Sequence, residues 1–182
     1  MSEQHRTEQG ALSPVAQKFI LHWGEMGTRW GINRTVAQIH ALLYLTPKPL
    51  NAEEIAETLA VARSNVSTSL KELQGWGIVK LSHVMGDKRD HFESMKDVWE
   101  MFRLVLDERK KREIDPTREM LRNCLVELAK GGKADPYTQE RLTRMQDFFE
   151  TMSRWYDELE KLSTQALIKF VRLGEKLRKW IG

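Results

Sequence analysis

Short polar side chains are concentrated between positions 63 and 71, and their types suit contacts with nucleic acid. Val66, Leu70 and Leu73 recur at the spacing of one buried helix face, so the side chains between them point away from the core. Arginine and asparagine form paired hydrogen bonds with base edges, while serine, threonine and lysine contact bases or phosphates. This pattern predicts a DNA-contacting helix face, with an exposed face that has no partner as the alternative. The face comprises Arg63, Ser64, Asn65, Ser67, Thr68 and Lys71.

A charged turn, Gly-Asp-Lys-Arg-Asp, follows at positions 86–90. It separates a stretch of period-two alternation at 78–84 from a second short stretch at 91–95, as in a β-hairpin. Lys88 and Arg89 at its tip would reach phosphates or a narrow minor groove, whose negative potential favours arginine. We expect the two flanking aspartates to orient Arg89. The alternative is a charged turn that serves only solubility.

No pattern in the sequence indicates an enzyme. The five histidines are scattered without metal-ligand spacing, and there is one cysteine. A nucleophile elbow and a phosphate-binding glycine loop are both missing. We therefore predict a protein that is not an enzyme and uses neither a metal nor a cofactor.

Length and composition set the broad class. The chain has 182 residues, of which 41% are hydrophobic and 30% charged, enough for one sizeable core or two small ones. A single cysteine excludes a disulfide framework. The sequence has neither an apolar run of membrane-spanning length nor a signal-peptide core near its start, so we expect a soluble cytoplasmic protein.

The net charge of +3 does not by itself indicate DNA binding. Residues 1–95 hold 10 basic and 10 acidic side chains, whereas residues 96–182 hold 19 and 16. DNA binding by the first part must therefore depend on where its charges lie.

The elements that hold the polar face have the order of a winged helix-turn-helix. Helices are predicted at 14–31, 34–45, 51–59 and 63–74, followed by the hairpin. We therefore predict a mobile tail at 1–13 and a DNA-binding domain at 14–95.

The remainder, residues 96–182, is predicted to be a helical dimerisation region. Asp-Pro pairs at 115–116 and 135–136 are typical of helix starts. From Leu142 to Trp180 an apolar stripe follows a heptad-like period, which predicts one helix of about 60 Å. Such a helix would bury its stripe against a second copy of the chain, while a bundle within a monomer is the alternative. The candidate dimer contacts are Leu142, Met145, Phe149, Met152, Tyr156 and Leu159.

Six tryptophans are many for a chain of this length. Aromatic faces can enclose a quaternary ammonium group, so four of them form a candidate effector pocket between the two parts. The alternative is ordinary core and interface packing. The four are Trp23, Trp30, Trp99 and Trp155.

The sequence resembles the GbsR branch of the MarR-type transcriptional regulators over residues 14–102. The likeness rests on Ser64-Asn-Val-Ser67, Leu73-Gln-Gly-Trp-Gly-Ile-Val79 and Gly86-Asp-Lys-Arg-Asp90, in that order. It implies a mainly α winged-helix fold and a homodimeric repressor or activator of a pseudo-palindromic operator.

The resemblance also implies roles for individual positions. Those matching Ser64, Asn65, Ser67 and Thr68 face the major groove, and the one matching Arg89 approaches the minor groove. It further implies dimerisation through the N- and C-terminal helices. From a different functional class, the alternative is a winged-helix scaffold whose long helix recruits other proteins.

Overall fold

The computed structural model describes residues 12–131 and 135–181, with side chains as far as Leu173. Most of the predicted tail at 1–13 and the side chains of Leu177 and Trp180 lie outside this description. The chain separates into two compact units, Met1–Met101 and Phe102–Gly182. No helix within the described residues is long and apolar enough to cross a membrane.

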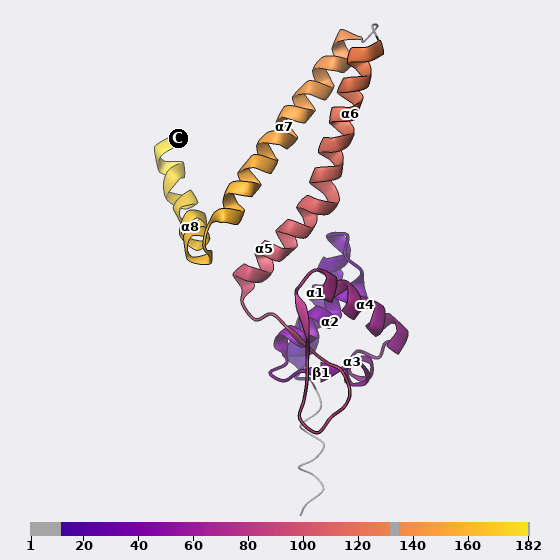
Figure 1. Cartoon of the computed structure of the whole chain (residues 1–182). Helices are drawn as coiled ribbons and strands as arrows, with labels where there is room; N and C mark the ends of the chain where they lie inside the picture. Colours follow the sequence, from indigo (N-terminus) through magenta and orange to yellow (C-terminus); the bar gives the residue numbers. More distant parts are fainter. Residues whose placement is uncertain (1–11, 132–134, 182) are drawn as a thin grey trace, which may run out of the picture. The chain divides into compact units, whose positions relative to one another are not determined.

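The first unit is a winged helix-turn-helix, as predicted (Figure 1). A three-stranded antiparallel sheet of order β1-β3-β2 accompanies its helices. The helices are α1 (Pro14–Arg29), α2 (Arg34–Leu45), α3 (Ala52–Leu59) and α4 (Arg63–Gly75), and the strands are β1 (Leu50–Asn51), β2 (Val79–Ser82) and β3 (His91–Ser94).

Strand β1 was missed by the sequence analysis, which found β structure only in the hairpin. Its two residues pair with β3, Leu50 opposite Phe92 and Asn51 opposite His91. Two residues are too few to show a period of two, and the pairing partner lies about forty positions away.

Local capping explains where the helices of this unit begin. The Ser13 hydroxyl accepts a hydrogen bond from the Ala16 N–H at 3.2 Å, ahead of Pro14 at the first helical position. Asn51 and Glu54 form the predicted capping box, each side chain accepting from the other residue's N–H at 3.0 and 2.8 Å. These contacts satisfy backbone donors that would otherwise lack partners.

The core of the first unit forms where α2, α3 and α4 meet. Ile39, Ile55 and Val66 are completely buried. Helix α1 approaches α2 through glycine, because a Cβ at Gly27 would lie 2.5 Å from the Cβ of Ala37. This core fixes the orientation of α4, whose outer face is exposed to solvent.

Helix α5 (Val98–Arg109), most of which belongs to the second unit, continues through a π-helical turn (Lys110–Ile114) into α6 (Asp115–Gly131). The prediction that Asp115 caps the start of a separate helix is wrong, because the chain is helical on both sides of it. Asp115 has helical dihedrals, and its N–H bonds to the carbonyl of Lys110, five residues back. Pro116 has no N–H and clashes with the carbonyl four residues before it, so the wider turn admits proline without ending the helix.

The prediction of a single long C-terminal helix is also wrong. The structure has two helices there, α7 (Pro136–Lys161) and α8 (Thr164–Ile181) (Figure 1). Leu162 is extended, with φ −72° and ψ 141°. The Ser163 hydroxyl then accepts from the Ala166 N–H at 3.2 Å and starts α8. Arg103 donates to the carbonyls of Glu160 and Leu162 and so satisfies the end of α7.

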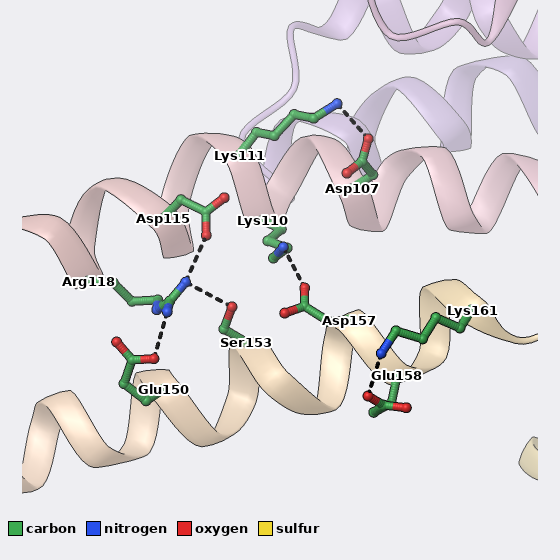
Figure 2. Close-up of polar contacts among 10 residues, drawn as sticks. All are labelled: Asp107, Lys110, Lys111, Asp115, Arg118, Glu150, Ser153, Asp157, Glu158 and Lys161. Atoms are coloured by element: carbon green, nitrogen blue, oxygen red, sulfur yellow. Dashed lines mark hydrogen bonds and ion pairs between the residues drawn. The ribbon is translucent and has the colours of Figure 1, made fainter.

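Ion pairs fasten α7 to the helix beside it (Figure 2). Arg118 donates to Glu150 at 2.6 Å and to the Ser153 hydroxyl at 3.0 Å, and the guanidinium lowers the pKa of Glu150. About two turns away, Lys110 and Asp157 lie 2.7 Å apart. The neighbouring α6 and α7 therefore hold a fixed register.

Candidate nucleic-acid interface

Helix α4 presents a polar outer face. All six residues of α4 that were predicted to contact DNA are exposed, while Val66, Leu70 and Leu73 are at most 2% exposed. The exposed six are Arg63, Ser64, Asn65, Ser67, Thr68 and Lys71.

The start of α4 has no side-chain cap. Ala62, the residue before the helix, provides no capping side chain. The preceding turn contains Ala60 in the left-handed conformation, with φ 53° and ψ 45°. Unpaired N–H groups and the positive end of the helix dipole favour a phosphate at such a position.

Helix α4 and the wing, the segment between β2 and β3, line one hollow of about 560 Å³. Helix α4 contributes Arg63, Ser67 and Lys71, and the wing contributes Lys88 and Arg89. The structure thus brings five of the eight predicted contact residues to one groove. Ser64, Asn65 and Thr68 lie on the same exposed face of α4, outside the groove lining.

Arg89 is held by a carboxylate, as expected, but by only one of the two flanking aspartates. Its backbone N–H and its Nε each donate to Asp87 Oδ1 at 3.0 Å. This contact lowers the pKa of Asp87 and raises that of Arg89. His91 also contributes, with Nδ1 2.9 Å from the Arg89 carbonyl. The wing therefore presents its arginine in a fixed orientation.

Two groove residues were missed by sequence reasoning. Gln74 lies one turn after Lys71 on the same face of α4, and the helical period would have found it. Glu53 belongs to α3 and forms an ion pair with Arg63 at 2.8 Å. No spacing in the sequence indicates the ion pair between Glu53 and Arg63, because it joins two helices across a turn.

Three of the four tryptophans of the candidate effector pocket belong to the first unit. Trp23 and Trp30 meet edge to face, with ring centroids 5.7 Å apart. Trp99 is half-buried in the first unit, and Trp155 belongs to the second unit, where it is 47% exposed. Trp23 also lines a small cavity of about 80 Å³ with Phe19, His40, Ala41, Tyr44, Val98 and Met101.

His40 in that cavity is buried and neutral. Burial, with a smaller effect of the nearby Lys96 ammonium, lowers the pKa of His40 to about 4. Its Nε2 atom has no hydrogen-bond partner within the described part of the chain. Lys96 instead donates to the carbonyls of Leu43, Tyr44 and Thr46 at 2.8–2.9 Å, which caps the end of α2.

The candidate dimer residues differ in their exposure. Tyr156 is 9% exposed and packs inside the second unit, while Leu159 lines a cavity there. Met145 is 49% exposed, and Leu142, Phe149 and Met152 are half-buried. Phe148 and Trp155, which flank the stripe, are 57% and 47% exposed. Among the described residues no cluster of side chains has the composition of a metal site.

Comparisons with known proteins give a consistent result. Residues 30–90 match the family described as MarR family. The HTH-type transcriptional repressor GbsR of Bacillus subtilis (strain 168) is 23% identical over 154 residues, which cover 81% of this chain and 85% of the relative. A solved structure titled "Crystal Structure of a transcriptional regulator" has a TM-score of 0.61 at 23% identity, covering 87% of this chain and 99% of that one.

Proposed function

We propose that this chain, a GbsR/MarR-type regulator whose residues 30–90 form the MarR family domain, controls transcription as a homodimer bound to a pseudo-palindromic operator. The observation that carries the proposal is the groove shared by α4 and the wing. A recognition helix and a wing that face one groove are the parts with which winged-helix proteins hold a duplex. The protein acts in the cytoplasm, and a small-molecule effector modulates its binding.

The polar face of α4 reads the major groove. Asn65 is suited to paired hydrogen bonds with adenine, and Ser67 and Thr68 reach bases or phosphates. Lys88 and Arg89 contact the backbone or enter the minor groove. In the free protein Glu53 forms an ion pair with Arg63 and holds its side chain in place. When DNA binds, Arg63 leaves Glu53 and contacts a phosphate instead.

The dimer uses an exposed face of α7. Met145, Phe148, Met152 and Trp155 follow each other by three, four and three residues, so they lie on one side of the helix. Three of the four are 47–57% exposed. A helix face this apolar is suited to the same face of a second copy.

The test of DNA binding starts with selection of duplexes from a random pool by the full-length protein. The winner and a scrambled duplex are then titrated across a salt series. We expect an inverted repeat bound about 10³-fold or more tightly than the scramble. Equal, weak binding that salt abolishes would refute sequence-specific regulation and favour the protein-recruiting scaffold.

Two variants test the contacts themselves. Asn65→Ala is expected to cost about 1–3 kcal/mol on the selected site and to relax base preference. Arg89→Ala is expected to weaken binding to all duplexes and to reduce the salt dependence. Unchanged affinity in both variants would show that this surface of α4 and the wing does not contact DNA.

Light scattering tests the dimer. Phe148→Glu places a charge in the apolar face and is expected to yield monomers that lose operator binding. Arg154→Glu changes an exposed residue on the opposite side of α7 and serves as the matched control. A Phe148→Glu variant that remains dimeric would exclude this face from the interface.

A further inference from the structure

The second unit contains a cavity that the proposed DNA interface does not use. Its volume is about 340 Å³, and α5, α7 and α8 each contribute to its wall. Four leucines supply most of the apolar lining: Leu104, Leu106, Leu159 and Leu167. Leu167 is only 2% exposed, so α8 closes one side of the cavity.

Two polar side chains in the wall have unused hydrogen-bonding capacity. Tyr156 is 9% exposed, and its buried hydroxyl has no partner within the described part of the chain. The buried Nε of Arg103 also has none there, although both Nη atoms of Arg103 donate to carbonyls at the end of α7. Leaving a buried polar group without a partner is costly, and here two such donors lie in the wall of one cavity, where a bound molecule would satisfy them.

The charges around the cavity restrict what it can accept. Asp107 and Glu160 also line it, and burial together with these carboxylates raises the pKa of Tyr156. The hydroxyl therefore stays protonated and can donate a hydrogen bond. The same carboxylates oppose an anion, and the Arg103 guanidinium opposes a cation beside it.

We propose that this cavity binds a neutral, mainly apolar molecule whose carbonyl-type oxygen accepts hydrogen bonds from Tyr156 and Arg103. The leucines enclose the apolar body, and the two donors fix the oxygen at one end. That the ligand acts as an effector of transcription rests on the function proposed above, whereas its binding does not.

The test uses the full-length protein and three probes that share a benzene ring: acetophenone, benzoate and benzylammonium. Ligand-observed NMR titrations compare their affinities. We expect acetophenone to bind most tightly and Leu104→Trp, which adds a bulkier ring to the cavity wall, to weaken its binding. A failure of acetophenone to bind, or equal binding of all three, would overturn the proposal.

Tyr156→Phe tests the hydroxyl directly. Removing one hydrogen bond is expected to weaken acetophenone binding about fivefold to tenfold. The free variant should melt no lower than the wild type, because the hydroxyl that it loses has no partner among the residues that the structure describes. Tyr137→Phe, at an exposed tyrosine outside the cavity, is the control and should bind as the wild type does. An unchanged affinity in Tyr156→Phe would refute the role of the hydroxyl.

Operator binding by the same samples separates the two proposals. Intact operator binding without acetophenone binding would overturn the ligand site alone. Acetophenone binding without operator binding would overturn the proposed function and leave the site standing.

Discussion

Acidification should destabilise the first unit through His40. In the unfolded chain His40 takes up a proton near pH 6.5, whereas burial lowers its pKa in the folded protein to about 4. Below pH 6.5 the unfolded state therefore binds more protons, and stability falls until the folded pKa is reached. One unit of pKa corresponds to about 1.4 kcal/mol, so lowering the pH from 7.5 to 5 costs about 2 kcal/mol through this residue.

Urea unfolding followed by tryptophan fluorescence measures this effect, because the ring centroids of Trp23 and His40 lie 6.3 Å apart. His40→Phe keeps an aromatic ring but cannot titrate, so its free energy of unfolding should fall about 2 kcal/mol less than that of the wild type over this pH range. His22→Gln, at an exposed histidine on α1, is the matched control and should behave as the wild type does. Equal pH dependence in His40→Phe and the wild type would refute the reasoning.

Three further predictions concern local geometry and are checked by the free energy of unfolding in urea. Ala60→Gly should stabilise the protein by up to about 1 kcal/mol, because only glycine adopts positive φ without strain, whereas Ala62→Gly, at an ordinary φ of −63°, should destabilise it. Gly27→Ala should cost about 1–3 kcal/mol, since its Cβ would lie 2.5 Å from the Cβ of Ala37, and adding Ala37→Gly should restore part of the loss. Lys96→Met should cost about 1–3 kcal/mol by removing the donor to three carbonyls at the end of α2, and a loss below about 0.5 kcal/mol would show that water replaces it.

The helix-turn-helix could be predicted because its signals are local. The spacing of Val66, Leu70 and Leu73 defines the buried side of α4, and all three are buried. The capping box at Asn51 marks the start of α3. The groove also depends on Glu53, which meets Arg63 only after the chain has turned, and no local pattern contains that contact.

The two Asp-Pro pairs show where local signals fail. Asp135-Pro136 starts α7, with the Asp135 carboxylate accepting from the N–H groups of Tyr137 and Thr138. The same dipeptide at 115–116 lies inside continuous helix. No glycine stands in the four residues before position 115, whereas two glycines, a lysine and an alanine precede position 135, and the glycines disfavour a helix that continues into Asp135.

The break between α7 and α8 was hidden by the phase of the apolar stripe. The steps from Leu159 to Ser163 and on to Ala166 are four and three residues, as in an unbroken helix. Periodicity records which side of a helix is apolar and does not record whether the helix continues. The Ser163 cap carried the missing information, and a search for caps inside long periodic stretches would have found it.

The π-helical turn at Lys110–Ile114 acts as a one-residue insertion in an otherwise regular helix. Each residue of an α-helix advances the chain by about 100°, so the extra residue rotates every side chain of α6 by that amount relative to the part of α5 that precedes it. At this rotation Arg118 meets Glu150 on α7. Gain or loss of a single codon in this turn would rotate the α6–α7 hairpin relative to α5 without altering any residue on the hairpin's surface, which gives evolution a small genetic step between different orientations of this hairpin.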